Sequence, residues 1–228
     1  MFRWKTRSSV SAPPGAIDSA PHRMPRNTGD RLAYAITRVL RFFADLLFAQ
    51  RYGHRAIVLE TVAAVPGMVG ATLTHLRCLR RSEADSGWIR RLMDEAENER
   101  MHLMTFVQIA QPSGAERALV ILAQGVFYNV YFVLYLVAPG VAHRMVGYFE
   151  EEAVRSYTEY LTLIDTGVHA NVPAPEIARS YWNLPPEATL RDVVIAVRAD
   201  EAGHRDVNHG RADGLRADDG APDVAKRV

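Results

Sequence analysis

The sequence predicts an all-α protein: a four-helix bundle with two additional helices that face a membrane without crossing it. Three observations lead to this prediction. Apolar residues recur at helical spacing over six segments, strand signals are nearly absent, and glutamates and histidines recur on four of the six segments. With 228 residues, 48% of them hydrophobic, the chain is long enough for one domain and too short for two large ones.

The six helices are expected at about residues 31–50, 54–81, 87–111, 115–144, 146–168 and 189–210. Gly87 and the Pro112-Ser113-Gly114 break mark helix boundaries, and segment 171–186, with four prolines, is expected to be a long irregular connection. Outside the helical domain, 30–210, we expect a flexible basic N-terminal arm, 1–29, and a disordered tail, 211–228.

The fourth helix resembles a membrane span, because residues 118–142 contain no Asp, Glu, Lys or Arg. A crossing there would separate the third helix from the fifth by a bilayer core about 30 Å thick, so their polar residues could not share one site. We therefore expect a monotopic protein whose fourth helix lies against the membrane surface. The first helix carries an apolar stripe beside three arginines and would complete that surface, although ordinary bundle core is the alternative.

Glu-x-x-His motifs occur at 99–102 and 201–204, on the third and sixth predicted helices. Residues i and i+3 share a helix face, so each motif can offer a carboxylate oxygen and an imidazole nitrogen to one point. With 13 Glu and 8 His in the chain, chance alone yields roughly 0.5 such motifs, so the spacing by itself is weak. A glutamate-bearing helix precedes each motif, around Glu60 and around Glu150. The resulting order, Glu, Glu-x-x-His, Glu, Glu-x-x-His, is that of ferritin-like bundles that hold two irons.

Three consecutive glutamates, at 150–152, compete for the core face of the fifth helix. Adjacent residues are about 100° apart on a helix, so only one of the three can be centred on that face. We favour Glu150, because it shares a stripe with Tyr157 at i+7, and small Ala153 between them leaves room for a metal or a substrate ring.

Four stretches resemble the alternative oxidases, the cyanide-insensitive ubiquinol oxidases: LETVAAVPGM (59–68), NERMHL (98–103), EEEA (150–153) and RADEAGHRDVNH (198–209). The resemblance runs from about 30 to 209. It implies two irons held by six ligands: Glu60, Glu99, His102, Glu150, Glu201 and His204. Glu99 and Glu201 would bridge the two irons. Two positions depart from the family, Phe149 in place of Leu and Gly203 in place of a second His; neither is a ligand, but Gly203 could change the tuning of the site.

The resemblance also implies roles around the metals. Tyr157 takes the place of the family's catalytic tyrosine, a source of an electron and a proton, against the alternative of a core tyrosine. Arg55, more weakly Arg41, and Ala153 would line a quinol pocket, against the alternative of surface side chains. Asn98 and Asp200 could orient ligand imidazoles. Four further residues fit positions of the family, and we expect them to form structural hydrogen bonds: His143, His209, Tyr181 and Trp182.

Net charge and cysteine content restrict the partners. A formal charge of +1 gives no global field for nucleic acid, so none is expected as a partner. Five arginines at 77–91 form a cationic cluster that could attract anionic lipid headgroups or remain a solvated face. Cys78 is the only cysteine of the chain, so an intramolecular disulfide is excluded and control through a cysteine in the N-terminal arm is not expected.

The expected function is that of a membrane-associated ubiquinol oxidase that reduces O₂ to water without pumping protons. A related plastoquinol oxidase and a non-catalytic membrane-bound helical protein are the alternatives. Ubiquinol, O₂ and the lipid surface are the expected partners, and the resemblance adds a homodimer. We favour the cytoplasmic face of a bacterial inner membrane, with the matrix face of the mitochondrial inner membrane as the alternative, because four prolines interrupt a possible transit helix in the arm.

Overall fold

The computed structural model describes residues 22–48 and 52–220, and it confirms the all-α prediction. The helices of this part of the chain are α1 (Thr28–Phe48), α2 (Tyr52–Arg81), α3 (Trp88–Ala110), α4 (Gly114–Val137), α5 (Pro139–Asp165), α6 (Glu176–Trp182) and α7 (Leu190–Gly220). Over the same residues the sole β feature is an isolated bridge between Pro173 and Thr189.

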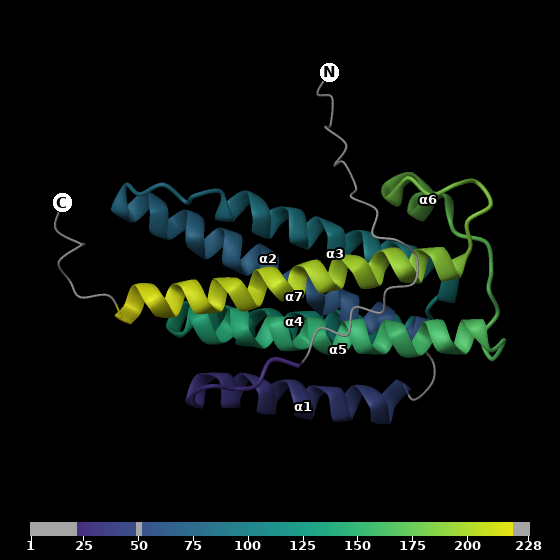
Figure 1. The fold of residues 1–228 in the computed structure, drawn as a ribbon, viewed down its shortest axis with the longest axis horizontal. Helices are drawn as coiled ribbons and strands as arrows, with labels where there is room; N and C mark the ends of the chain where they lie inside the picture. The colour runs from purple at the N-terminus through teal and green to yellow at the C-terminus, as the bar shows by residue number, and fades with distance from the viewer. Residues whose placement is uncertain (1–21, 49–51, 221–228) are drawn as a thin grey trace, which may run out of the picture.

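Two helix pairs form the bundle: α2 packs along α3, and α5 packs along α7 (Figure 1). The remaining long helices lie outside these pairs, with α4 against α2 and α1 along α5 at the edge of the molecule (Figure 1). The short α6 sits near one end, where it contacts α3. The four bundle helices are those predicted to carry the metal ligands, and α1 and α4 are the two additional helices.

Three boundaries differ from the prediction. The fourth helix ends at Val137 and the fifth begins at Pro139, because Ala138 adopts a non-helical conformation (φ −149°, ψ 67°) and Pro139 occupies the first turn, where a missing N–H costs nothing. The apolar run that continues past this break concealed it in the sequence. A short helix, α6, forms inside the segment expected to be irregular, and α7 continues to Gly220, into the segment assigned to the tail.

The end of the predicted N-terminal arm is bound to the bundle where the structure describes it, from residue 22. The ring of His22 lies 2.5 Å from a carboxylate oxygen of Glu151, and the backbone N–H of Arg23 donates to the other oxygen at 3.0 Å. Arg144, fully buried in α5, donates to Asp30 of α1 at 2.9 Å. Residues 1–21 of the arm lie outside the described part of the chain.

The interior contains two apolar clusters that are separated along the bundle by a polar layer. One cluster includes Ile57 of α2 and Tyr157 of α5, and the other includes Val65 of α2 and Val146 of α5. On both helices the predicted ligand, Glu60 or Glu150, falls between the residues of the two clusters. The acidic side chains are therefore enclosed by apolar packing on two sides.

α1 and α4 expose apolar faces that nothing in the described chain covers. Both α2 and α4 are long and apolar enough to span a membrane, but 56% of the apolar stretch is buried in α2 and 11% in α4. α2 is therefore a core helix. The exposed apolar side chains include Leu32, Val39, Leu40, Phe42, Phe43 and Leu46 of α1, and Ile121, Leu122, Val126, Val130, Val133, Leu136 and Val137 of α4.

Both bundle pairs depend on a glycine at a close approach. A Cβ on Gly67 of α2 would lie 2.4 Å from the backbone oxygen of Leu92 in α3. A Cβ on Gly147 of α5 would lie 2.4 Å from the ring of His209 in α7. Gly203 of α7, by contrast, is exposed and would meet no atom within 4 Å, so the family's histidine at this position would lie outside the metal site.

The glycines give a matched pair of stability predictions. Gly67→Ala should destabilise the protein by about 1–3 kcal/mol, because the two helices must move apart. Gly203→Ala should stabilise it by up to about 1 kcal/mol, because alanine favours the helix and meets open space. Urea unfolding of both variants measures the two values. A Gly67→Ala variant as stable as wild type would show that the close approach is unimportant.

Candidate metal centre

Six side chains from the four bundle helices converge in the polar layer. Ligand atoms of Glu60, Glu99, His102 and Glu201 all lie within 4.8 Å of one another, and so do those of Glu99, Glu150, Glu201 and His204. We call these groups the His102 subsite and the His204 subsite. Glu99 and Glu201 belong to both, which is the arrangement that two bridging carboxylates produce.

The two imidazoles face the carboxylates through Nδ1. His102 Nδ1 lies 3.4 Å from Glu60, 3.3 Å from Glu99 and 3.3 Å from Glu201. His204 Nδ1 lies 2.6 Å from Glu99 and 3.7 Å from Glu201. The i, i+3 spacing within α3 and within α7 thus places a carboxylate and an imidazole together, as the sequence predicts.

Burial and mutual repulsion perturb the acids. Burial, followed by repulsion from Glu201, raises the pKa of both Glu60 and Glu150 well above the ordinary value. Burial also opposes the ionisation of Glu99, but the neighbouring His102 and His204 hold its pKa well below the ordinary value. Four carboxyl groups so close together in a dry interior require positive charge among them.

The donor atoms match what a pair of metal ions needs. Buried atoms without a hydrogen bond of acceptable geometry include Glu60 Oε2, both oxygens of Glu99, Glu201 Oε2 and Nδ1 of both histidines. Each such unsatisfied group ordinarily costs about 1–3 kcal/mol. Carboxylate oxygens and imidazole nitrogens that face one point are suitable ligands for iron or manganese. The residues present therefore fit a two-metal carboxylate-bridged site.

Residues around the His102 subsite hold its imidazole in place. His102 Nε2 lies 3.4 Å from Asp200, which accepts hydrogen bonds from Asn98 at 2.9 Å and from the Trp182 indole at 2.8 Å. The Trp182 ring stacks on His102 with centroids 5.7 Å apart. Asp200 thus occupies the orienting position expected for it, while Asn98 acts through Asp200 and also donates to the Tyr181 hydroxyl at 3.0 Å.

Tyr157 reaches the metal centre from α5. Its hydroxyl donates a hydrogen bond to Glu60, and its ring stacks on Phe106 with centroids 5.7 Å apart. Burial, followed by the charge of Glu60, raises the pKa of Tyr157 well above its ordinary value, so the phenol keeps its proton.

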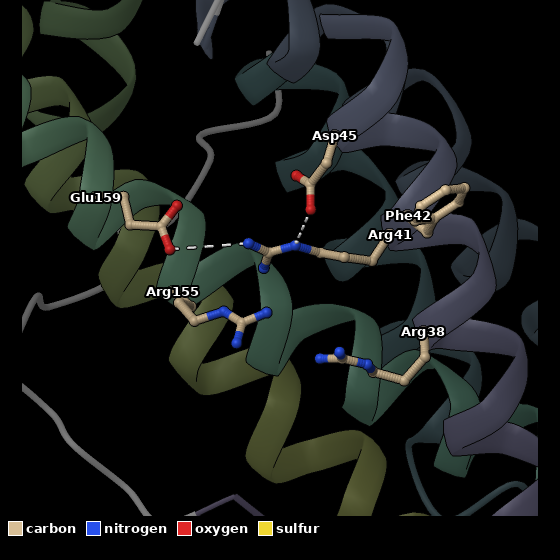
Figure 2. A pocket seen from close by; sticks show the side chains of 6 residues that line it. All are labelled: Arg38, Arg41, Phe42, Asp45, Arg155 and Glu159. Atoms are coloured by element: carbon tan, nitrogen blue, oxygen red, sulfur yellow. Dashed lines mark hydrogen bonds and ion pairs between the residues drawn. The ribbon is translucent and has the colours of Figure 1, made fainter. Parts of the chain in front are cut away.

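The residues predicted for a quinol pocket do not all share one cavity. Arg41 lines a pocket of about 270 Å³ between α1 and α5, together with Arg38, Phe42, Asp45, Arg155 and Glu159 (Figure 2). Arg55 does not line it; its side chain is buried and lies 2.5 Å from Asp45, a lining residue. Ala153 is partly buried against the apolar cluster that contains Tyr157 and is not a lining residue. Sequence reasoning missed Asp45 and Glu159, both ion-paired with Arg41.

His143 has the structural role expected of it. Its Nδ1 lies 2.8 Å from Asn208 Oδ1 and its Nε2 lies 3.1 Å from the Tyr135 hydroxyl. Burial lowers the pKa of His143 from 6.5 to about 4, so the ring is neutral. His209, similarly structural, lies 2.9 Å from Glu151 and 2.8 Å from Arg144.

Sequence reasoning also missed Glu95, a buried acid of α3. It lies one helical turn before Glu99, so the i, i+4 spacing on the ligand face was the signal that could have found it.

Comparisons with known proteins identify the family of the chain. The family model described as "Alternative oxidase" matches residues 16–213. The chain is 56% identical to the mitochondrial ubiquinol oxidase of Mangifera indica over 92% of this chain and 65% of the relative. It is 57% identical to the mitochondrial ubiquinol oxidase 1a of Oryza sativa subsp. japonica, over 92% of this chain and 62% of the relative. It is 60% identical to the mitochondrial ubiquinol oxidase 1a of Arabidopsis thaliana, over 86% of this chain and 56% of the relative. The chain thus spans between 56% and 65% of these relatives' lengths.

The relatives correct one prediction. They are named as mitochondrial proteins and come from plants, so the favoured location at a bacterial inner membrane is wrong. That choice depended on the prolines of the arm. Most of them lie outside the described part of the chain, and they do not support a bacterial location against the evidence of the relatives.

Metal content should distinguish shared from unshared ligands. Glu60→Gln alters one subsite and should retain about half of the wild-type metal, whereas Glu99→Gln alters both and should retain almost none. Elemental analysis of the purified variants measures this. Equal metal content in the two variants would contradict the assignment of Glu99 to both subsites.

The stability of the metal-free protein should fall in acid because of His143. Its pKa is lower in the folded state, so neutral His143 contributes stability above pH 6.5, and this is lost as the pH falls towards 4, where the unfolded state binds the extra proton. The expected loss between pH 7 and pH 4 is about 3 kcal/mol. Urea unfolding at several pH values measures it, and a His143→Gln variant should lack this part of the slope. An equally steep slope in that variant would exclude His143 as its source.

Proposed function

The chain belongs to the alternative oxidase family, as its four motifs predict, and we propose on this premise that it is a membrane-associated ubiquinol oxidase that reduces O₂ to water. The observation that carries the proposal is the buried pair of subsites that share Glu99 and Glu201. A surface cluster of acids, as in a non-catalytic helical protein, would not place two imidazoles and four carboxyl groups inside the bundle.

We propose that the two subsites hold two iron ions per chain. Bound there, the irons would accept electrons from quinol and pass them to O₂. Two ubiquinols supply four electrons and four protons, which convert one O₂ into two waters and leave two ubiquinones. The chain's own part is to hold the ligands in place: Asp200 fixes the His102 ring, and the two apolar clusters keep bulk water away.

Tyr157 is the proposed catalytic residue. Its phenol holds a proton beside Glu60, within reach of the metal ligands, and the raised pKa keeps that proton in place. A phenol so placed can supply one proton and one electron when the oxygen–oxygen bond breaks. Tyr157→Phe keeps the stacking on Phe106 and removes the hydroxyl.

We propose that quinol approaches through the pocket between α1 and α5. A lipid-soluble substrate has to enter from the bilayer, and α1 carries exposed apolar side chains next to this pocket, Phe42 among them. Arg41 and the Arg55–Asp45 pair supply the polar groups for the quinol hydroxyls. Ala153 lies further in, against the cluster around Tyr157.

The names of the relatives and the exposed apolar surface support a proposed location and assembly. The mitochondrial names of the relatives favour the mitochondrial alternative for this chain, with α1 and α4 against the membrane. A homodimer remains a prediction; α2 and α3 expose apolar side chains that could supply its interface, namely Met68, Leu76, Leu79 and Met93.

Quinol-dependent oxygen uptake tests the proposed function. Membranes that contain the wild-type protein should consume O₂ in the presence of cyanide, and Glu150→Ala should abolish this, because it removes a ligand of the His204 subsite. Tyr157→Phe should retain metal and lose at least about tenfold in kcat. An oxygen electrode measures all three proteins.

Arg90→Gln is the control, because Arg90 is an exposed partner of Asp94 at the far end of α3, and its uptake should equal wild type. A metal-loaded wild-type protein without uptake would contradict the proposed function. A faster rate with plastoquinol than with ubiquinol would support the related plastoquinol oxidase.

A further inference from the structure

A fifth buried carboxyl group, Glu95, lies beside the His204 subsite. It is 6% exposed and belongs to neither group of ligand atoms. Burial raises the pKa of Glu95, and repulsion from Glu99 and Glu201 adds to this, whereas attraction to His204 and the hydrogen bond from Asn208 oppose it. Glu95 is thus electrically coupled to the metal ligands although it is not itself placed to bind a metal.

Asn208 of α7 holds Glu95 in this position. Its side-chain N–H groups donate to Glu95 at 2.9 Å and to the backbone oxygen of His204 at 3.0 Å. Its Oδ1 faces Nδ1 of His143 at 2.8 Å, so this nitrogen carries the proton and Nε2 accepts from Tyr135. The reverse amide orientation would set Oδ1 against two acceptors, so this network admits one arrangement.

The two subsites therefore have different supporting carboxylates. The His102 ring meets Asp200, which hydrogen bonds from Asn98 and Trp182 hold in place. Within the described residues, the His204 ring meets carboxylates of the ligand set alone, and Glu95 reaches that subsite through Asn208 and the His204 backbone. The charged groups that act most strongly on Glu95 are His204, Glu99 and Glu201, so bound metals would add the main counter-charge.

We propose that Glu95 is a positioning residue of the His204 subsite: once metals are bound it is an ionised carboxylate, Asn208 holds it away from the metals, and its charge strengthens metal binding and favours the oxidised centre. The inference rests on the metal centre proposed above. A negative charge in a low-dielectric interior stabilises nearby cations, and it stabilises the more highly charged oxidised state more than the reduced state.

Glu95→Gln removes the charge, retains the size, and still accepts the N–H of Asn208. Without metal, this variant should have a higher Tm than wild type, because a buried carboxylate without a cationic partner is gone. Its iron affinity should fall about tenfold or more, so that iron raises its Tm less than that of wild type. The midpoint potential of the iron centre, measured by redox titration, should shift upward.

Two further variants separate charge from structure. Glu97→Gln lies two residues away on the exposed side of α3, paired with Arg100, and should change neither the iron affinity nor the potential. Glu95→Asp shortens the side chain and disturbs the contact with Asn208 but keeps the charge, so its potential should stay close to that of wild type. If Glu95 had a purely structural role, Glu95→Asp would change the iron affinity and the midpoint potential more than Glu95→Gln does.

The outcomes are distinguishable. Iron affinity and midpoint potential unchanged in Glu95→Gln would overturn the inference while leaving the oxidase proposal intact. A Glu95→Gln protein that is less stable than wild type without metal, or that fails to fold, would also overturn it. Wild-type protein that binds no iron would overturn the proposed centre, and this inference with it.

Discussion

The mutual repulsion of four carboxyl groups in a dry interior is the constraint on which the rest of this structure depends. Glu60, Glu99, Glu150 and Glu201 lie within ligand distance of common points, and the unsatisfied oxygens of Glu60, Glu99 and Glu201 need cations to balance them. The helix pairs are packed to bring them there. Gly67 and Gly147 let α2 approach α3 and α5 approach α7 closely, and the apolar clusters on either side exclude the water that would otherwise screen the charges.

The resemblance supplied the full ligand set, and helical spacing alone pointed to its two Glu-x-x-His pairs, because each pair is local. The i, i+3 spacing joins Glu99 to His102 and Glu201 to His204 whatever the rest of the fold does. The role of Tyr157 came from the family resemblance, and its stripe with Glu150 on α5 was the reason to choose Glu150 among the three glutamates. The break at Ala138 was missed because apolar residues continue across it, and α6 was missed because prolines surround it.

Features that depend on contacts between distant segments were beyond sequence reasoning. Arg55 is buried only because Asp45, ten residues earlier on another helix, meets its guanidinium. Asn208 links Glu95 of α3 to His143 of α5, and no local sequence pattern connects these three residues. Gly203, which seemed able to change the site, proved to face open space, a distinction between two sides of one helix that the motif does not contain. The predicted bacterial location depended on the prolines of the N-terminal arm, and the mitochondrial relatives overturned it.

The contacts of α6 have a consequence for the rate at which metal ions exchange. A helix of seven residues has no stability of its own in water, so α6 stays in place through contacts such as those of Tyr181 and Trp182. His102 beneath it is fully buried, whereas the His204 side chain is 13% exposed. Local opening of α6 breaks few hydrogen bonds and uncovers the His102 ring while the bundle stays folded. Metal ions bound at the two subsites would thus exchange by different routes, one directly from solvent and the other through the opening of about two turns of helix.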